Sequence, residues 1–205
     1  MKIGAIILAA GSSRRFGGDK RKAQLDNGNS VLVTTIKGVA KHFEDILLVL
    51  RHDDEIFANQ LKTDIGEVIS NTNFTIYCAP DSSKGMAHSL ANGITQVTDW
   101  DAAAIFLGDM PFLQSASIEL LIDAMIANID SMPIVIPYLD GKSGNKPGHP
   151  VIFHKQYFEE IARLSGDRGA KAVIDANRSR VVKIQLDDLG VLKDIDTRED
   201  LGELH

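Results

Sequence analysis

Short apolar runs that alternate with amphipathic stretches constrain the fold of this chain more than any other feature of its sequence. The runs are rich in Ile, Leu and Val, which is typical of strands buried on both faces of a sheet. Between two of them, apolar residues recur at steps of four, four and three from Met86 to Val97, and a similar helical pattern covers Ile118 to Ile129. We therefore expect a mainly parallel sheet with helices on both faces. The expected strands are Ile3 to Leu8, Ile46 to Leu50, Phe74 to Cys78, Ala103 to Leu107 and Ile134 to Ile136.

One further helix is expected near the N-terminus, and the pattern changes after Pro137. Ser30 is suited to cap a helix that covers Val31 to Val39. Residues 140–150 are polar and rich in Gly, Pro and Lys, which predicts a loop. No repeat, low-complexity tract or linker divides the chain, so we expect a single domain over residues 1–205. Beyond the loop we expect strands at Val151 to Phe153 and Val181 to Leu186, and helices that begin near Lys155 and Arg168.

The composition excludes some functions and indicates a cellular setting. With 22 basic and 28 acidic residues the net charge is −6, so we expect no nucleic-acid-binding surface, which would need dense positive charge. Cys78 is the single cysteine, which excludes an internal disulfide and fits a reducing cytoplasm. No apolar run approaches the roughly 18 residues of a membrane span, and the N-terminal run lacks the features of a signal peptide. We expect a cytoplasmic protein without a membrane partner.

The expected strand Ile3 to Leu8 leads directly into a glycine-rich, cationic loop that ends at Lys20. Backbone N–H groups can approach phosphate oxygens where side chains are small, and Arg15 and Lys20 would supply countercharge. The loop lacks both Gly-x-Gly-x-x-Gly and Gly-x-x-x-x-Gly-Lys-Ser/Thr, which argues against a dinucleotide oxidoreductase and a P-loop kinase. The loop therefore predicts a polyphosphate site; the alternative is a solvated turn with ordinary surface cations.

Acidic residues follow another expected strand and lie near the C-terminus. Asp109 stands at the carboxyl edge of the strand that ends at Leu107, where a carboxylate can hold Mg²⁺ beside phosphates. Asp194 and Asp196 would point the same way in an extended segment, which makes Asp196 a candidate second ligand. The alternatives are a helix-capping role for Asp109 and a solvated acidic turn around Asp196, with Asp200 in a capping box.

Two further segments have polar residues that could contact substrates. The helix that opens at Gly85 should place His88, Ser89 and Asn92 off its apolar face, where they could contact a base or ribose or simply face solvent. His149 in the polar loop could contact a second substrate or have a structural role. No Gly-x-Ser-x-Gly elbow and no zinc-ligand spacing is present in the sequence.

Taken together, these motifs resemble the MobA-like nucleotidyltransferases of molybdenum-cofactor maturation. The resemblance implies a Rossmann-like, three-layer α/β/α nucleotidyltransferase fold and transfer of a nucleotide from an NTP to a phosphorylated acceptor, with release of pyrophosphate. Relatives with Leu-Ala-Ala-Gly in the first loop resemble cytidylyltransferases, so Ala10 implies CTP rather than GTP. The matching motifs are Leu8-Ala9-Ala10-Gly11-x-Ser13-x-Arg15-Phe16-Gly17-x-x-Lys20, Gly85-Met86-x-x-Ser89-Leu90, Gly108-Asp109-Met110-Pro111, Gly148-His149-Pro150, Gly166-Asp167-x-Gly169-Ala170 and Asp194-Ile195-Asp196-Thr197.

The resemblance also implies roles for individual residues. Arg15, Lys20 and Asp109 would be catalytic, and Asp109 and Asp196 would hold Mg²⁺ or Mn²⁺. The acceptor would be a molybdopterin-type phosphate, and a molybdoenzyme would receive the product. Two departures are Phe16, where the family commonly has Met, and Lys146-Pro147 before Gly148, where cytidylyltransferases usually have Arg. The implied binding residues are Leu8, Ala9, Ala10, Gly11, Ser12, Ser13, Gly17, Pro80, Gly85, Ser89, Gly108 and His149.

The residues leave alternatives open. One is a cytidylyl-, guanylyl- or uridylyltransferase that acts on another phosphorylated acceptor. The other is a protein without enzymatic activity that binds a nucleotide and carries the cofactor to a molybdoenzyme. Release of pyrophosphate would distinguish the enzymes from the carrier.

Overall fold

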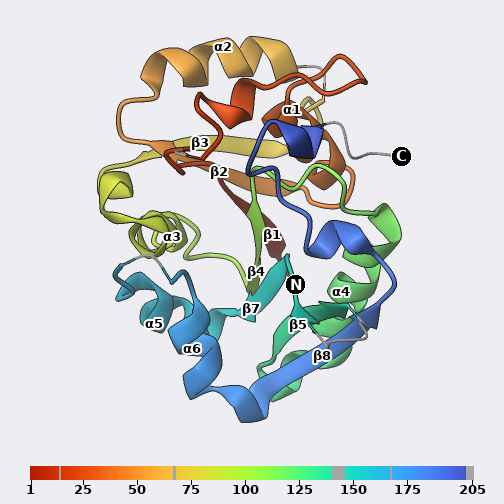
Figure 1. Cartoon of the computed structure of the whole chain (residues 1–205). Coiled ribbons are helices and arrows are strands. Elements are labelled where there is room, and N and C mark those ends of the chain that lie inside the picture. Colours follow the sequence, from red (N-terminus) through yellow and green to blue (C-terminus); the bar gives the residue numbers. More distant parts are fainter. Residues whose placement is uncertain (14, 67, 140–145, 167, 202–205) are drawn as a thin grey trace.

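A computed structural model describes residues 1–13, 15–66, 68–139, 146–166 and 168–201 of the chain (Figure 1). The described strands form one mixed sheet of eight, in the order β3-β2-β1-β4-β7-β5-β6, with β8 beside β5. The pairs β1–β2, β2–β3, β1–β4 and β5–β8 are parallel, and β7 and β6 are antiparallel to their neighbours. The strands are β1 Ile3–Leu8, β2 Asp45–Arg51, β3 Asn73–Ala79, β4 Ala102–Leu107, β5 Ile134–Leu139, β6 Lys146–Pro147, β7 Val151–His154 and β8 Val181–Leu186.

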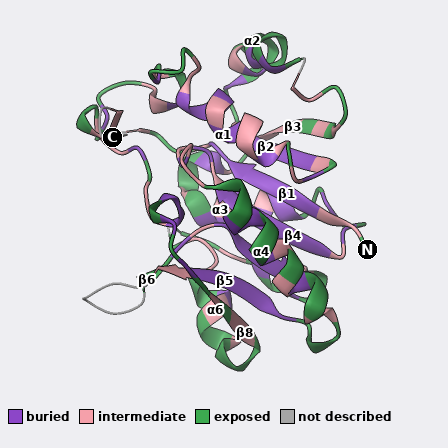
Figure 2. Cartoon of the chain, turned by 90° about the vertical axis from the view of Figure 1, so that its right-hand side faces the viewer, coloured by how far each residue is buried: buried purple, intermediate pink, exposed green. Residues whose placement is uncertain are grey.

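Helices cover both faces of the sheet, as the alternation predicts. Along β1, Ala5 and Ile7 pack with α1, α2 and α4 on one face, while Ile6 and Leu8 pack with α3, α5 and α6 on the other. The strands are consequently buried along most of their length, as Figure 2 shows for β1, β4 and β5. The helices are α1 Val31–Val39, α2 Glu55–Ile65, α3 Met86–Ile94, α4 Ser115–Ala127, α5 Phe158–Ala162 and α6 Lys171–Ala176.

Local signals explain most element boundaries. Ser30 caps α1 as expected, because its Oγ accepts a hydrogen bond from the Val33 amide at 3.3 Å. The helix expected near Lys155 begins as a single 3-10 turn before α5, and the one expected near Arg168 begins at Lys171. Part of the predicted 140–150 loop is wrong, since Lys146–Pro147 pairs with β5 as the short strand β6. Residues 140–145 lie outside the described residues.

The register of β1 and β4 determines where the site forms. The two strands are adjacent and parallel, with Leu8 opposite Leu107, so the segments that follow them leave the sheet at the same edge. Gly108 allows them to lie close together, because a Cβ there would be 2.9 Å from Ala9 Cβ and 3.2 Å from the Leu8 carbonyl oxygen. The Gly108 amide donates to that oxygen at 2.9 Å.

Among the described residues, no helix has the length and apolar character that a membrane crossing requires.

Candidate active site

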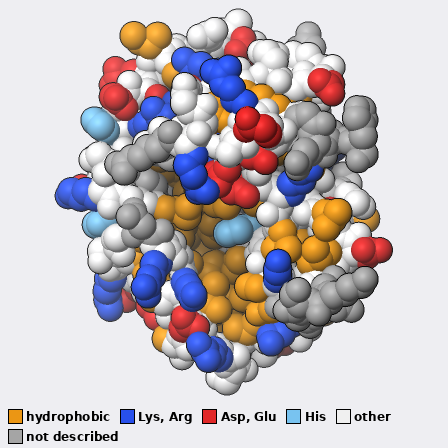
Figure 3. Space-filling model, viewed as in Figure 1, with side chains coloured by type: hydrophobic (Ala, Val, Ile, Leu, Met, Phe, Trp, Pro, Cys, Tyr) orange, Lys and Arg blue, Asp and Glu red, His pale blue; other side chains and the backbone are white. Residues whose placement is uncertain are grey.

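A cavity of about 680 Å³ opens at the edge of the sheet where β1, β2 and β4 end. Figure 3 shows this face hollowed, with acidic and basic side chains grouped above a floor of hydrophobic ones. Most of the binding and catalytic residues expected from the sequence line the cavity. These are Leu8, Ala9, Ala10, Gly11, Ser12, Ser13, Arg15, Lys20, Gly85, Ser89, Gly108, Asp109 and Asp196.

Three carboxylates meet in this cavity, one more than the two metal ligands expected from the sequence. Oxygen atoms of Asp109, Asp194 and Asp196 lie within 4.8 Å of one another. Oδ1 of Asp109 is buried and has no hydrogen-bond partner within the part of the chain that the structure describes. Partial burial, followed by the charges of Asp196 and Asp109, raises the pKa of Asp194. A cluster of hard oxygen ligands with an unpartnered buried oxygen fits a divalent cation.

The two acidic segments are held together through the backbone. The Ile195 amide donates to the Asp109 carbonyl at 2.9 Å. The Ile195 side chain is fully buried in a small cluster that includes Phe16 of the glycine-rich loop. Because neighbouring side chains of an extended segment alternate, burial of Ile195 leaves Asp194 and Asp196 free to face Asp109. Asp200 accepts hydrogen bonds from the Asp196 and Thr197 amides, which confirms the expected capping contact.

The predicted phosphate-binding cations are paired with these same carboxylates. Lys20 Nζ lies 2.6 Å from Asp109 Oδ2 and 3.0 Å from Asp196 Oδ1, and Arg15 Nη1 lies 2.7 Å from Asp196 Oδ2. Burial alone would lower the pKa of Lys20, but the charges and hydrogen bonds of Asp109 and Asp196 outweigh it and raise the pKa. Lys20 is therefore charged at neutral pH and lies against the carboxylates.

The glycine-rich loop has the open backbone that a phosphate site needs. A Cβ at Gly11 would meet no heavy atom within 4 Å. Ser13 and Gly17 have positive φ angles of 51° and 70°, and Ser13 Oγ is buried with no hydrogen-bond partner among the described residues. Arg51 Nε donates to the Gly11 carbonyl at 3.2 Å and supports the loop from β2. Arg14 lies outside the described residues.

Three of the predicted binding residues do not line the cavity. Gly17 forms a turn of the loop, and Pro80 is exposed after β3. His149 is half-buried beside the core, where its amide donates to the Val191 carbonyl at 2.8 Å and the His149–Pro150 peptide bond is cis. Burial lowers the pKa of His149, against the opposing effects of the Ile105 carbonyl and the charges of Asp109 and Asp194. Its ring is consequently neutral at neutral pH.

The polar residues of α3 differ from the expectation. Ser89 is only 2% exposed and not on a solvent-facing side of the helix, although it reaches the cavity wall. Asn92 has a structural role, because its Oδ1 accepts from the Asp81 amide at 3.1 Å. His88 is half-buried and does not line the cavity. Gly166 contacts the start of α3, where its carbonyl accepts from the Ala87 amide at 3.1 Å, whereas Asp167 lies outside the described residues.

One wall of the cavity was not predicted from the sequence. Its residues come from the last residue of β2 and from the segments after β2 and β3, and they are joined where the Ser82 hydroxyl accepts a hydrogen bond from the His52 amide at 3.0 Å. Their position after two parallel strands is the signal that could have found them, because ligands bind beyond carboxyl strand ends. The missed residues on this wall are Arg51, His52, Asp53, Ser82, Ser83 and Lys84.

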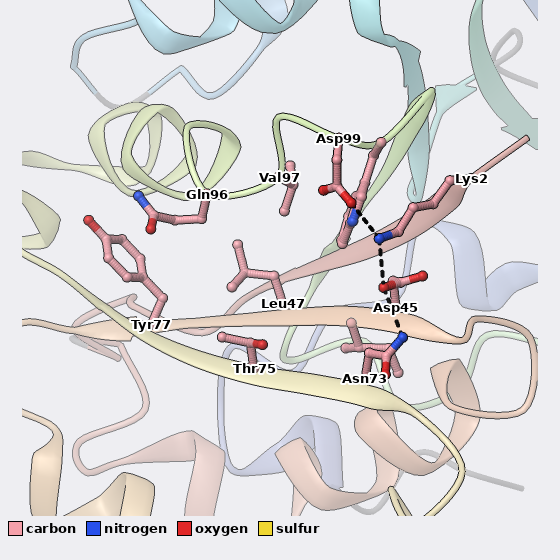
Figure 4. Close-up of a pocket in the computed structure, with 11 residues that line it drawn as sticks. Lys2, Asp45, Leu47, Asn73, Thr75, Tyr77, Gln96, Val97 and Asp99 are labelled. Atoms are coloured by element: carbon pink, nitrogen blue, oxygen red, sulfur yellow. Dashed lines mark hydrogen bonds and ion pairs between the residues drawn. The ribbon is translucent and has the colours of Figure 1, made fainter.

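A second, smaller cavity of about 250 Å³ lies toward the amino ends of β1, β2 and β3 (Figure 4). Its charged groups neutralise one another, since Lys2 Nζ lies 3.1 Å from Asp45 Oδ1 and 2.6 Å from Asp99 Oδ2. Asn73 Nδ2 donates to the same Asp45 oxygen at 3.2 Å. Because these charges are paired with one another, the smaller cavity does not combine cations, carboxylates and an open glycine-rich loop as the larger one does.

A family model described as "MobA-like NTP transferase domain" matches residues 5–181. Among individual relatives, the purine catabolism protein PucB of Bacillus subtilis is 25% identical over 198 residues, which are 95% of this chain and 92% of that protein. A probable molybdenum cofactor guanylyltransferase of Natranaerobius thermophilus is 27% identical over 139 residues, covering 68% of this chain and 62% of the relative. One of Mycolicibacterium paratuberculosis is 26% identical over 208 residues, covering all of this chain and 95% of that protein.

Solved structures share the fold over nearly the whole chain. Rv0371c of Mycobacterium tuberculosis superposes with a TM-score of 0.76 at 25% identity and covers 98% of this chain and 96% of its own. The 4-diphosphocytidyl-2C-methyl-D-erythritol synthase of Anaerococcus prevotii superposes with a TM-score of 0.75 at 19% identity, covering 98% and 92%. Another structure of Rv0371c, a complex with manganese, has a TM-score of 0.71 at 23% identity, covering 98% and 96%.

Proposed function

The chain belongs to the MobA-like NTP transferase domain family, and we propose that it transfers CMP from CTP to the terminal phosphate of a molybdopterin-type acceptor. The observation that carries the proposal is one cavity in which an open glycine-rich loop, two cations and three carboxylates converge. Phosphoryl chemistry needs this combination, because catalysis depends on positioning and on neutralising charge around phosphorus.

We place the triphosphate along the loop from Ala10 to Lys20. The exposed backbone at Gly11 and the unpartnered hydroxyl of Ser13 support this placement, since both can donate hydrogen bonds to phosphate oxygens. Arg15 and Lys20 are positioned to exchange their carboxylate partners for the β- and γ-phosphates. They would then stabilise the charge that develops on the departing pyrophosphate.

Asp109, Asp194 and Asp196 are the residues that would hold a divalent cation, and Mg²⁺ or Mn²⁺ suits their oxygen ligands. When bound, the cation would neutralise phosphate charge beside the reacting phosphorus. The unpartnered Oδ1 of Asp109 supports this assignment, because a buried carboxylate oxygen without a partner is costly. Asp194 joins the two ligands expected from the sequence.

The chemistry requires little of the protein beyond orientation. An oxygen of the acceptor phosphate forms a bond to the α-phosphorus of the NTP, the bond from that phosphorus to the α–β bridging oxygen breaks, and its electron pair leaves with pyrophosphate. The acceptor phosphate is already anionic at neutral pH, so no general base is needed. A neutral His149 outside the cavity wall is consistent with such a mechanism.

The identity of the nucleobase in the NTP is the most specific part of the proposal. Ala10 lines the cavity in a Leu-Ala-Ala-Gly loop, which supports CTP. A guanylyltransferase is the second candidate, and it is supported by two relatives that are named probable molybdenum cofactor guanylyltransferases. With either nucleotide, we propose that the protein acts in the cytoplasm and that a molybdoenzyme receives its product.

Pyrophosphate release is the experiment that tests the proposal. The purified chain is assayed with Mg²⁺, each of CTP, GTP and UTP, and molybdopterin, and then with sugar and alcohol phosphates as acceptors. We expect release with CTP and molybdopterin. Release with GTP alone would replace the cytidylyl assignment by the guanylyl one, and release only with another acceptor would replace molybdopterin. Nucleotide binding without release for any acceptor would favour the carrier.

A further inference from the structure

Arg21 is a buried cation that the mechanism above does not use. Its residue is only 3% exposed, and its five N–H groups all have acceptors. Nε and Nη2 donate to the two oxygens of Asp19 at 2.8 and 2.7 Å, and Nη2 also donates to Asp54 Oδ1 at 3.0 Å. Nη1 donates to the Ala9 carbonyl at 3.0 Å and to Asp54 Oδ2. The guanidinium also lies over the Phe57 ring, 4.5 Å from its centroid.

These acceptors come from three separate places in the chain. Ala9 is the first residue after β1, and Asp19 is the residue before Lys20, so the two stand at opposite ends of the glycine-rich loop. Asp54 immediately precedes α2. One guanidinium therefore joins both ends of the loop to each other and to the segment between β2 and α2. Only the planar, five-donor fork of arginine can make all these bonds at once.

Arg21 differs in this respect from the two cations assigned to phosphate. Arg15 and Lys20 pair with carboxylates of the proposed metal site, so a bound metal ion could replace them there. Every N–H group of Arg21, in contrast, donates to the protein backbone or to the carboxylates of Asp19 and Asp54. Binding a ligand phosphate would require Arg21 to break a buried hydrogen bond, which is costly. Arg21 is consequently not a ligand-binding cation, although its residue borders the cavity.

We infer that Arg21 is the positioning residue for Lys20, an inference that rests on the proposed transferase function. Lys20 stands between Asp19 and Arg21 in a single 3-10 turn, and both neighbours are anchored by the guanidinium. The turn cannot shift without breaking buried hydrogen bonds, so the lysine side chain starts from a fixed backbone. Its Nζ is thereby held beside the acidic cluster, where the triphosphate is proposed to lie.

Arg21→Lys tests the inference, because lysine keeps the charge and loses the fork. We expect kcat for pyrophosphate release to fall about 10- to 100-fold, as misplacement of a reacting group typically causes, while KM for the nucleotide changes less than about twofold. Lys22→Met is the matched control. Lys22 is the next residue of the same turn and lies over the same Phe57 ring, 4.9 Å from its centroid, but it is exposed and outside the Arg21 network. The control should retain wild-type kcat.

A double-mutant cycle separates positioning from general weakening of the fold. If Arg21 acts through Lys20, Arg21→Lys in a Lys20→Met background should lower kcat/KM by less than about twofold, because the group that it positions is already absent. An equal loss in both backgrounds overturns the inference. If Arg21→Lys melts below the assay temperature, Asp54→Asn is measured in the same cycle, since it removes one carboxylate from the same guanidinium.

A second readout does not depend on activity. Lys20 is ion-paired and its side chain is 13% exposed, so acetic anhydride should modify it slowly in the wild type. In Arg21→Lys or Asp54→Asn, the acetylation rate of Lys20 relative to Lys22, followed by mass spectrometry, should rise at least about threefold as the anchored turn loosens. An unchanged ratio overturns the inference. If the wild type releases no pyrophosphate with any substrate pair, the proposed function fails while the labelling still decides the role of Arg21.

Discussion

The amide of Ile195 donates a hydrogen bond to the carbonyl oxygen of Asp109 at 2.9 Å, although 86 positions separate the two residues. This bond aligns the C-terminal acidic segment with the edge of β4. With Ile195 fully buried, the carboxylates on either side of it face Asp109. The acidic cluster is therefore a product of backbone register and core packing together.

Asp109→Asn should abolish most of the proposed activity and leave the fold intact. The change removes one negative charge from the cluster and preserves the volume of the side chain, and loss of several kcal/mol of transition-state stabilisation corresponds to at least about a 100-fold fall in kcat. Steady-state pyrophosphate release measures this. Asp123→Asn, on the exposed side of α4, is the matched control and should retain wild-type turnover. Wild-type turnover in Asp109→Asn would exclude the proposed metal ligand.

Lys20→Met should affect metal and nucleotide binding in opposite directions. Without ligands, the ammonium occupies the acidic cluster, so its removal should tighten binding of Mn²⁺ alone. With Mn²⁺ present, the same change should weaken binding of a non-hydrolysable CTP analogue by about 10- to 100-fold, since a charged hydrogen bond is typically worth about 1.5–3 kcal/mol. Titration calorimetry with Mn²⁺ and a non-hydrolysable CTP analogue, added singly and together, measures both effects. Weaker Mn²⁺ binding in the variant would contradict competition between the lysine and the metal.

Asp54→Asn should remove a contribution to the free energy of unfolding that the wild type has at neutral pH and loses at acid pH. Burial alone would raise the pKa of Asp54, but the hydrogen bonds and charge of Arg21 outweigh burial and hold the pKa below its ordinary value of 3.8. Because the pKa is lower in the folded state, this stabilisation is fully present above about pH 4 and is lost as the pH falls through the folded-state pKa. The difference in unfolding free energy between wild type and variant should thus be constant from pH 5 to 8 and shrink below about pH 4. Urea unfolding at each pH measures it, and a constant difference down to pH 2.5 would contradict the assignment.

The parts of this molecule that follow from local sequence were predictable, and those that depend on long-range side-chain pairing were not. Apolar runs revealed the central strands, and their expected parallel arrangement placed Asp109 at the same edge of the sheet as the glycine-rich loop. Helix α2 was not predicted because its sequence is mostly polar, and only Ala58, Leu61 and Ile65 of its residues are buried. The contact between Arg21 and Asp54 joins residues 33 positions apart, and nothing in the periodicity of either segment marks it.

In the site, too, individual residues were predictable from local sequence, whereas the contacts between them were not. Their positions after expected strands and the family resemblance brought Lys20 and Asp109 into one hypothesis, as separate groups for phosphate and for metal. Their direct ion pair arises from the lengths and directions of two side chains on different loops, which the sequence pattern does not specify. The wall formed after β2 and β3 could have been found from strand ends alone, because those strands are parallel to β1.

Gly11 and Gly108 should respond differently to alanine, because they lie next to different surroundings. At Gly108 a Cβ would approach Ala9 Cβ to 2.9 Å and Leu32 Cδ1 to 3.1 Å, so Gly108→Ala should destabilise the fold by about 1–3 kcal/mol through overpacking. At Gly11 a Cβ would meet no heavy atom within 4 Å, so Gly11→Ala should leave the free energy of unfolding within about 1 kcal/mol of the wild type. Its methyl group would nevertheless stand where a phosphate must approach the backbone. We therefore expect KM for the nucleotide to rise at least about tenfold in Gly11→Ala, the effect of losing about 1.4 kcal/mol of binding. Urea unfolding and nucleotide titration distinguish the two effects, and unchanged nucleotide affinity in Gly11→Ala would remove the triphosphate from this part of the loop.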